Sequence, residues 1–148
     1  MPVEGLFLGL VLALVFTGLT GFYPGGLIVP GYLVLFAEDP ARILGTLVVA
    51  LLTWLLYRLA ATRLLLFGRR RTALMVLLGA CGSVAGAALL PTLFPVALEF
   101  RVIGLVVPGL IANHFERQGV AVTTAALVVV TSAAWLLTLT ARILGLTP

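Results

Sequence analysis

Residues 26–31 read Gly-Leu-Ile-Val-Pro-Gly, and residues 104–109 read Gly-Leu-Val-Val-Pro-Gly. A proline within an apolar helical segment removes a backbone hydrogen bond and breaks the helix. In lipid, the backbone groups freed by such a break are tolerated only where protein buries them or where they line a water-filled cavity. The two motifs therefore predict two short broken segments, about Gly25–Phe36 and Val102–Ala112, that turn at Pro30-Gly31 and at Pro108-Gly109.

Four longer apolar runs flank these motifs, and each is close to the about 20 helical residues that cross a bilayer. They are Gly5–Phe22, Ile43–Phe67, Ala73–Leu90 and Val120–Leu144. The order of long helix, broken segment and long helix thus occurs twice, which indicates an internal duplication with pseudo-repeats of about 5–67 and 73–146. Paired broken segments in corresponding positions point to a binding site in duplicated membrane proteins.

The composition fixes the broad class of protein. Of the 148 residues, 62% are hydrophobic and 9% are charged, and the mean hydropathy is +1.26. A soluble fold of this size could not bury so much apolar surface. This excludes a soluble enzyme, a disordered tail and a nucleic-acid-binding module. We predict an all-α integral membrane protein of the bacterial cytoplasmic membrane, with one transmembrane domain over residues 1–148 and four to six helical segments.

The arginines bear on topology, since all nine cationic side chains are arginines. Arg69, Arg70 and Arg71 form a loop over residues 68–72 that the positive-inside rule places in the cytoplasm. If the broken segments are re-entrant, four helices cross and both termini lie inside. If the segments cross, there are six crossings and both termini lie outside. Both alternatives leave six arginines inside; the short length of the segments favours the re-entrant one.

Polar residues follow the second motif and suggest an anion path. Glu99 and Arg101 share a face if the chain is extended there, and Asn113 and Arg117 share a face if it is helical. Arginine binds carboxylates bidentately. The half-helix after each break directs its free N–H groups toward the break, where they can also bind an anion. We predict a path for a polyanion lined by these four residues. The alternative is an interfacial loop with local ion pairs and two packed, kinked helices.

Neither a catalytic constellation nor a metal site is expected in this chain. His114 is the only histidine and Cys81 the only cysteine, so a histidine metal site and a thiolate metal site are both excluded. No cofactor is expected. Gly82 and Gly86 form a G-x-x-x-G pair that allows a close helix–helix contact. Its partner is either another helix of this chain or a second copy in a homo-oligomer.

Three motifs in order resemble one family over nearly the whole chain. They are Thr20–Leu33 (TGFYPGGLIVPGYL), Phe67–Arg71 (FGRRR) and Glu99–Gly119 (EFRVIGLVVPGLIANHFERQG). The chain resembles the membrane subunit of poly-γ-glutamate synthase, the PgsC/CapC family. The resemblance implies a membrane complex that polymerises glutamate through its γ-carboxylate. It implies two partners: a PgsB/CapB-like ligase, which would use ATP and a divalent metal, and a PgsA/CapA-like subunit with an extracytoplasmic domain.

These observations lead to one functional prediction and two alternatives. We predict a non-catalytic or co-catalytic membrane subunit that anchors the ligase and helps synthesis and export of the anionic polymer, in contact with lipid, polyglutamate and both partners. The first alternative is a stand-alone small anion transporter or channel built from a duplicated unit. The second is a membrane scaffold that does not contact the polymer.

Overall fold

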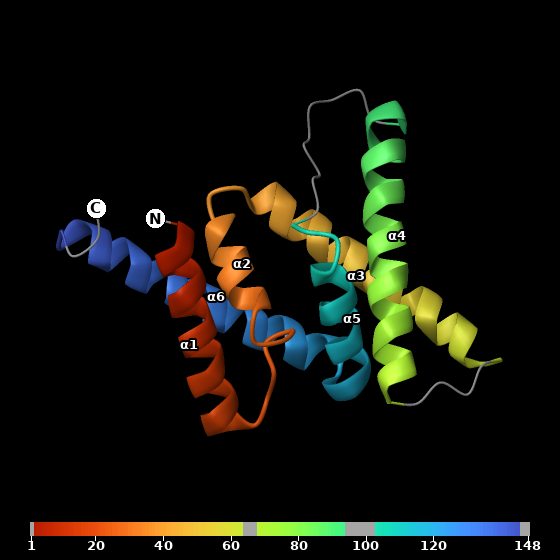
Figure 1. The fold of residues 1–148 in the computed structure, drawn as a ribbon, viewed down its shortest axis with the longest axis horizontal. Helices are drawn as coiled ribbons and strands as arrows, with labels where there is room; N and C mark the ends of the chain where they lie inside the picture. The colour runs from red at the N-terminus through yellow and green to blue at the C-terminus, as the bar shows by residue number, and fades with distance from the viewer. Residues whose placement is uncertain (1, 64–67, 94–102, 146–148) are drawn as a thin grey trace.

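The computed structural model describes residues 2–63, 68–93 and 103–145, and within them all regular structure is helical (Figure 1). The all-α prediction is therefore confirmed. Four of the helices are long and apolar enough to cross a membrane, as the four apolar runs predicted. The six helices in order are α1 Pro2–Thr20, α2 Val29–Leu35, α3 Pro40–Ala61, α4 Arg69–Leu93, α5 Val107–Gln118 and α6 Val120–Ile143.

The two repeated motifs start the two short helices. Pro30 and Pro108 lie in the first turn of α2 and of α5, where the missing proline N–H would have no helical partner anyway. The irregular backbone lies before each proline, with positive φ at Gly26 and Gly104. Each broken segment is thus an irregular first half followed by a half-helix, and the second half-helix continues to Gln118, further than the apolar pattern predicted.

Glycines bring each long helix into backbone contact with the half-helix that follows it. A Cβ atom built on Gly9 would lie 2.4 Å from the Gly31 Cα, and one on Gly79 would lie 2.6 Å from the Gly109 nitrogen. No side chain fits at either crossing. Two antiparallel hairpins result, α1 with α2 and α4 with α5 (Figure 1).

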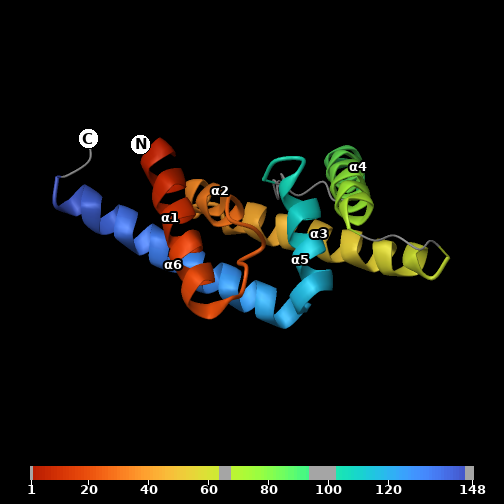
Figure 2. The ribbon, with the colours of Figure 1, turned by 60° about the horizontal axis from the view of Figure 1, so that its bottom comes forward.

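The third helix of each half packs on the hairpin of the other half. α3 lies against α4 and α5, whereas α6 lies against α1 and α2. Figure 2 shows α3 and α6 leading away from the centre in opposite directions. The central core draws on both halves, through Val29, Ala50, Val107 and Leu127 among others. Each hairpin is thus covered by the third helix of the other half.

The second half repeats the first in the inverted direction. In Figure 1, α1 runs downward and α2 upward, whereas α4 runs upward and α5 downward. The burial pattern repeats as well: the buried positions of α1 are Gly5, Gly9 and Ala13, and those of α4 are Met75, Gly79 and Ser83. Each half-helix therefore leads to the end of the bundle from which its preceding long helix came.

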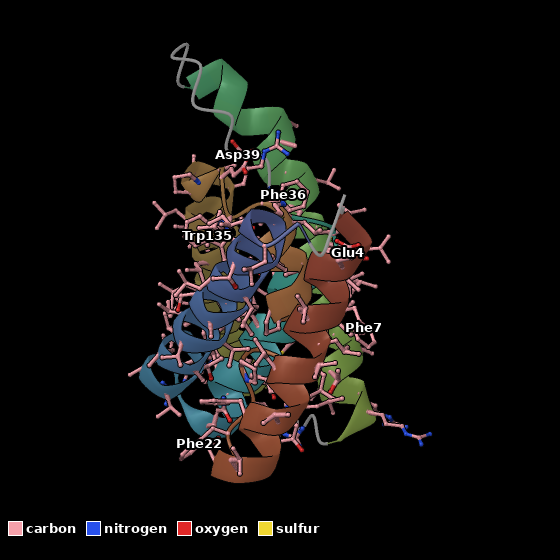
Figure 3. The ribbon with its side chains drawn as sticks, turned by 90° about the vertical axis from the view of Figure 1, so that its left-hand side faces the viewer. Glu4, Phe7, Phe22, Phe36, Asp39 and Trp135 are labelled. Carbon is pink, nitrogen blue, oxygen red and sulfur yellow. The ribbon has the colours of Figure 1, made fainter. Side chains whose placement is uncertain are left out.

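The charged residues that are described separate between the two ends of the bundle. α4 begins at Arg69, so the three consecutive arginines form its first turn. We call this the arginine end; it carries six arginines and one acid, Arg58, Arg63, Arg69, Arg70, Arg71, Arg117 and Glu116. Figure 3 shows Glu4 and Asp39 at the opposite end from Phe22. We call this the acidic end; it carries Glu4, Glu38, Asp39, Arg42 and Arg142.

Gly82 packs within the chain. A Cβ atom there would lie 3.3 Å from the Val49 Cγ1 of α3 and 3.9 Å from the Thr53 Oγ1. Gly86 lies one turn further along α4. Gly79 approaches a neighbouring helix more closely than Gly82 does, since a Cβ atom on Gly79 would lie 2.6 Å from the Gly109 nitrogen.

Candidate functional site

The predicted polyanion path is only partly described by the structure. Glu99 and Arg101 lie outside the described residues. Asn113 is 5% exposed and its Oδ1 accepts a hydrogen bond from the Thr72 hydroxyl at 3.5 Å, so its amide faces α4. Arg117 lies one turn further along α5 and is exposed. The two side chains therefore lie in different environments, one inside the bundle and one at the arginine end.

Gln118 joins the two halves at the arginine end. Its Oε1 accepts a hydrogen bond from the Tyr23 amide at 3.0 Å, and its Nε2 donates to the Tyr23 carbonyl and to Thr123 Oγ1. The His114 ring lies 5.6 Å from the Tyr23 ring, centroid to centroid. These polar side chains thus hold the loop after α1 against the last turn of α5.

Glu116 contacts α3. Its Oε2 accepts a hydrogen bond from Trp54 Nε1 at 2.8 Å, and the Arg58 guanidinium lies over the Trp54 ring at 5.1 Å from the centroid. The carboxylate is therefore used in holding α5 against α3. Arg58 is one of the six arginines that give the arginine end its strong positive charge.

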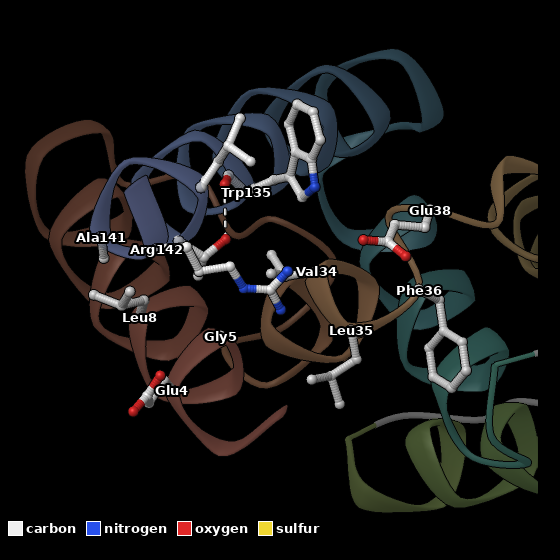
Figure 4. Close-up of a pocket in the computed structure, with 12 residues that line it drawn as sticks. Glu4, Gly5, Leu8, Val34, Leu35, Phe36, Glu38, Trp135, Ala141 and Arg142 are labelled. Atoms are coloured by element: carbon white, nitrogen blue, oxygen red, sulfur yellow. Dashed lines mark hydrogen bonds between the residues drawn. The ribbon is translucent and has the colours of Figure 1, made fainter. Parts of the chain in front are cut away.

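A cavity of about 430 Å³ opens at the acidic end between α1, α2 and α6 (Figure 4). The Arg142 guanidinium projects into it from α6, and the carboxylates of Glu4 and Glu38 lie on either side. Its remaining lining is mostly aliphatic and aromatic and includes Phe36 and Trp135, together with Thr138, whose hydroxyl donates to the Trp135 carbonyl. No sequence pattern indicates this cavity, because α6 reaches α1 and α2 only through the exchange of third helices between the halves.

The corresponding place in the second half is filled. Leu74 occupies the position on α4 that Glu4 occupies on α1, as the shared burial pattern shows. There, Tyr57, Met75 and Ala112 form a buried cluster against which Leu74 and Leu78 pack. The two halves thus share a backbone arrangement but differ at this place: one has a cavity with charged walls, and the other has an apolar core.

Comparison with known proteins agrees with the motifs. The family model described as "Capsule biosynthesis CapC" matches residues 8–124. The chain is 43% identical over 120 residues to "PGA biosynthesis protein CapC" of Bacillus subtilis (strain 168), and 40% identical over 119 residues to "Capsule biosynthesis protein CapC" of Bacillus anthracis. Each alignment covers 80% of both chains. No solved structure matches. The chain belongs to the CapC family of capsule biosynthesis proteins.

Proposed function

We propose that this chain is the membrane subunit of a poly-γ-glutamate synthase complex, where it anchors an ATP-dependent ligase subunit and helps to pass the polymer outward. Its family places it in capsule biosynthesis, and the name of the Bacillus subtilis relative refers to PGA. The predicted partners are a PgsB/CapB-like ligase and a PgsA/CapA-like extracytoplasmic subunit. In this proposal ATP and the divalent metal act in the ligase and not in this chain.

The inverted duplication is the observation that carries the export role. Many transporters consist of two inverted repeats, with broken helices near the middle of the membrane and a path between the repeats. Here α2 and α5 are half-helices preceded by irregular backbone, and they run in opposite directions. Irregular backbone at membrane depth is favourable only where protein or water satisfies it. These features fit a passage for an extended polyamide between the two halves, which would form when the central core opens.

The charges favour the crossing alternative, with six crossings and both termini outside. Each half-helix leads from one end of the bundle toward the other (Figure 1). In the described residues, the arginine end has six arginines against one acid, whereas the acidic end has two arginines against three acids. By the positive-inside rule the arginine end faces the cytoplasm. The re-entrant alternative would place Arg142 in the cytoplasm. In the structure, however, Arg142 lies at the acidic end, opposite the arginine end.

Cysteine labelling tests this orientation. In a Cys81→Ala background, Leu144→Cys at the acidic end should react with a membrane-impermeant maleimide in intact cells, and Thr62→Cys at the arginine end should react only after lysis. Both positions are exposed in the structure. Labelling of both positions, or of neither, in intact cells would contradict the proposed six crossings.

This orientation gives the ligase a docking surface. An ATP-dependent ligase works where ATP is, and the cytoplasmic surface of this chain would then be the arginine end. Exposed arginines attract a surface of opposite charge and fix its orientation. Replacing Arg69, Arg70 and Arg71 with glutamine should reduce recovery of the ligase with this chain in pull-downs, whereas Arg42→Gln at the other end should not.

Reconstitution tests the proposal as a whole. The ligase and extracytoplasmic subunits are placed in proteoliposomes with or without this chain, and ATP- and glutamate-dependent polymer is measured inside and outside. We expect polymer to cross the membrane only when the chain is present. Full synthesis and transfer without it would refute the proposal.

A stand-alone anion transporter is the second candidate, because the same inverted duplication also occurs in transporters that act alone. The two functions separate in proteoliposomes that contain only this chain. Electrogenic flux of chloride or glutamate without the ligase would favour the transporter, whereas flux that requires ligase and ATP favours the synthase subunit.

A further inference from the structure

The cavity at the acidic end has a mixture of charges that selects its ligand. We infer that it binds an α-amino-α-carboxylate group, as found on free glutamate and at the amino end of a γ-glutamyl chain. This inference rests on the proposed function, because that function supplies such a group at this membrane face. The site is formed by the carboxylates of Glu4 and Glu38, the guanidinium of Arg142 and the rings of Phe36 and Trp135.

Simple ions fit these walls poorly. A divalent cation would be held by Glu4 and Glu38 but would face the positive charge of Arg142, which lies between them (Figure 4). An inorganic anion would be held by Arg142 but repelled by two carboxylates. A ligand that carries both charges on adjacent atoms can satisfy both. Its carboxylate would pair with the guanidinium, which offers a planar two-pronged donor, and its ammonium group would bond to a glutamate oxygen.

The size and lining of the cavity agree with this ligand. At about 430 Å³, it falls within the roughly 300–1,000 Å³ that is usual for small-molecule sites. Val34 and Leu35 from α2 and Leu8 from α1 provide apolar walls that the methylene groups of a glutamyl side chain could contact. The cavity is thus suited to one or two residues at a chain end and not to a continuous polymer.

The comparison between the two halves supports a role beyond packing. The second half shows that this fold can close the equivalent space with Leu74, Tyr57 and Met75. Burying apolar side chains there is favourable, whereas bringing several charged groups to one cavity at a membrane edge has a desolvation cost. The first half nevertheless keeps the cavity open and lines it with three charged side chains. Glu4 and Arg142 lie outside the region that the family model matches, whereas Glu38 lies inside it.

Direct binding tests the inference. The full-length chain is placed in nanodiscs of phosphatidylcholine and phosphatidylglycerol and titrated calorimetrically with three probes: glutamate, a γ-linked glutamate trimer with a free amino end, and the same trimer N-acetylated. A charge-assisted hydrogen bond is worth about 1.5–3 kcal/mol, or roughly tenfold to a hundredfold in affinity. We expect the free-ended trimer to bind and N-acetylation to weaken it by that factor. Binding of glutamate alone would identify the free amino acid as the source of the group.

Matched variants locate the binding. Glu38→Gln and Arg142→Gln should each weaken the affinity for the trimer by about tenfold or more. Asp39→Asn and Arg63→Gln remove the same charges outside the cavity and should leave the affinity unchanged. Trimer binding should change the fluorescence of Trp135, a change that Trp135→Phe abolishes and Trp54→Phe retains. Each variant is first checked for wild-type melting temperature; Arg142→Lys, which keeps the charge but loses the two-pronged donor, serves if Arg142→Gln is unstable.

Three outcomes would overturn the inference: equal binding of the acetylated trimer, unchanged binding by both cavity variants, or binding only of phosphatidylethanolamine added to the nanodiscs, which would make the cavity a lipid site. None of these affects whether polymer production depends on the chain. Loss of that dependence with intact trimer binding would refute the proposed function and leave the cavity as an amino-acid site.

Discussion

The backbone crossings at Gly9–Gly31 and Gly79–Gly109 can be tested with single methyl groups. In Gly9→Ala the new Cβ would lie 2.4 Å from the Gly31 Cα and 2.7 Å from its nitrogen; in Gly79→Ala it would lie 2.6 Å from the Gly109 nitrogen. In both cases the obstacle is backbone, which cannot rotate aside as a side chain can. The two helices of the hairpin must therefore separate.

The expected cost follows from these distances. Carbon atoms in contact are ordinarily about 3.5–4.0 Å apart, so each hairpin must open by roughly 1 Å. Overpacking of this kind costs about 1–3 kcal/mol, and alanine returns about 0.5–1 kcal/mol in a helix interior. We expect a net loss of about 1–2 kcal/mol for each variant, or about 2–8 °C in melting temperature at this chain length.

The assay is thermal unfolding of the purified chain in detergent. The measured quantity is the fraction of the protein that stays monodisperse after heating to each temperature. Gly18→Ala is the matched control, because it lies in the same helix as Gly9 and a Cβ there would meet no atom within 4 Å. It should melt at the wild-type temperature or slightly above. Wild-type melting of both Gly9→Ala and Gly79→Ala would refute the close packing of the hairpins.

Two further predictions concern polar contacts between the halves, and the same unfolding assay measures both. Thr46 Oγ1 accepts a hydrogen bond from the Ile103 amide at 2.9 Å, so Thr46→Val should cost about 1–3 kcal/mol of stability by leaving a buried donor unpaired. The control is Thr53→Val, which should be nearly neutral because the Thr53 hydroxyl donates to the Val49 carbonyl of its own helix. Equal losses of stability in the two variants would contradict this account. Gln118→Leu removes the side chain that bonds both backbone groups of Tyr23 and should lower stability by about 1–3 kcal/mol, whereas an unchanged melting temperature would show that water replaces these bonds.

The sequence predicted the helical class and the long helices well, because both follow from composition and run length. The motifs at Pro30 and Pro108 also predicted short, broken segments at the right places, since proline acts on the local backbone whatever surrounds it. The motifs did not predict the direction in which each half-helix runs relative to the long helix before it. The direction of such a segment depends on what it packs against, and the glycine contacts Gly9–Gly31 and Gly79–Gly109 hold each half-helix against the long helix before it.

The site was harder to predict for the same reason. Asn113 and Arg117 both lie in α5, but the burial of one and the exposure of the other depend on where α4 ends its contact with α5. Spacing along one helix carries no information about a neighbouring helix. Glu4 and Arg142 are separated by nearly the whole chain, and only the exchange of third helices between the halves brings them to one cavity.

Comparing the two halves separates the features that serve the fold from those that can serve a function. The features shared by both halves, namely the glycine crossings, the proline-started half-helices and the burial pattern of α1 and α4, are those that the fold requires. The halves differ in the charge at their ends. They also differ at one equivalent position, which is an open cavity beside Glu4 and a filled apolar cluster beside Leu74. Because the two hairpins run in opposite directions, such differences make the two ends of the bundle chemically distinct. We therefore expect substitutions at the shared features to affect stability, and those at the unshared ones to affect function in a folded chain.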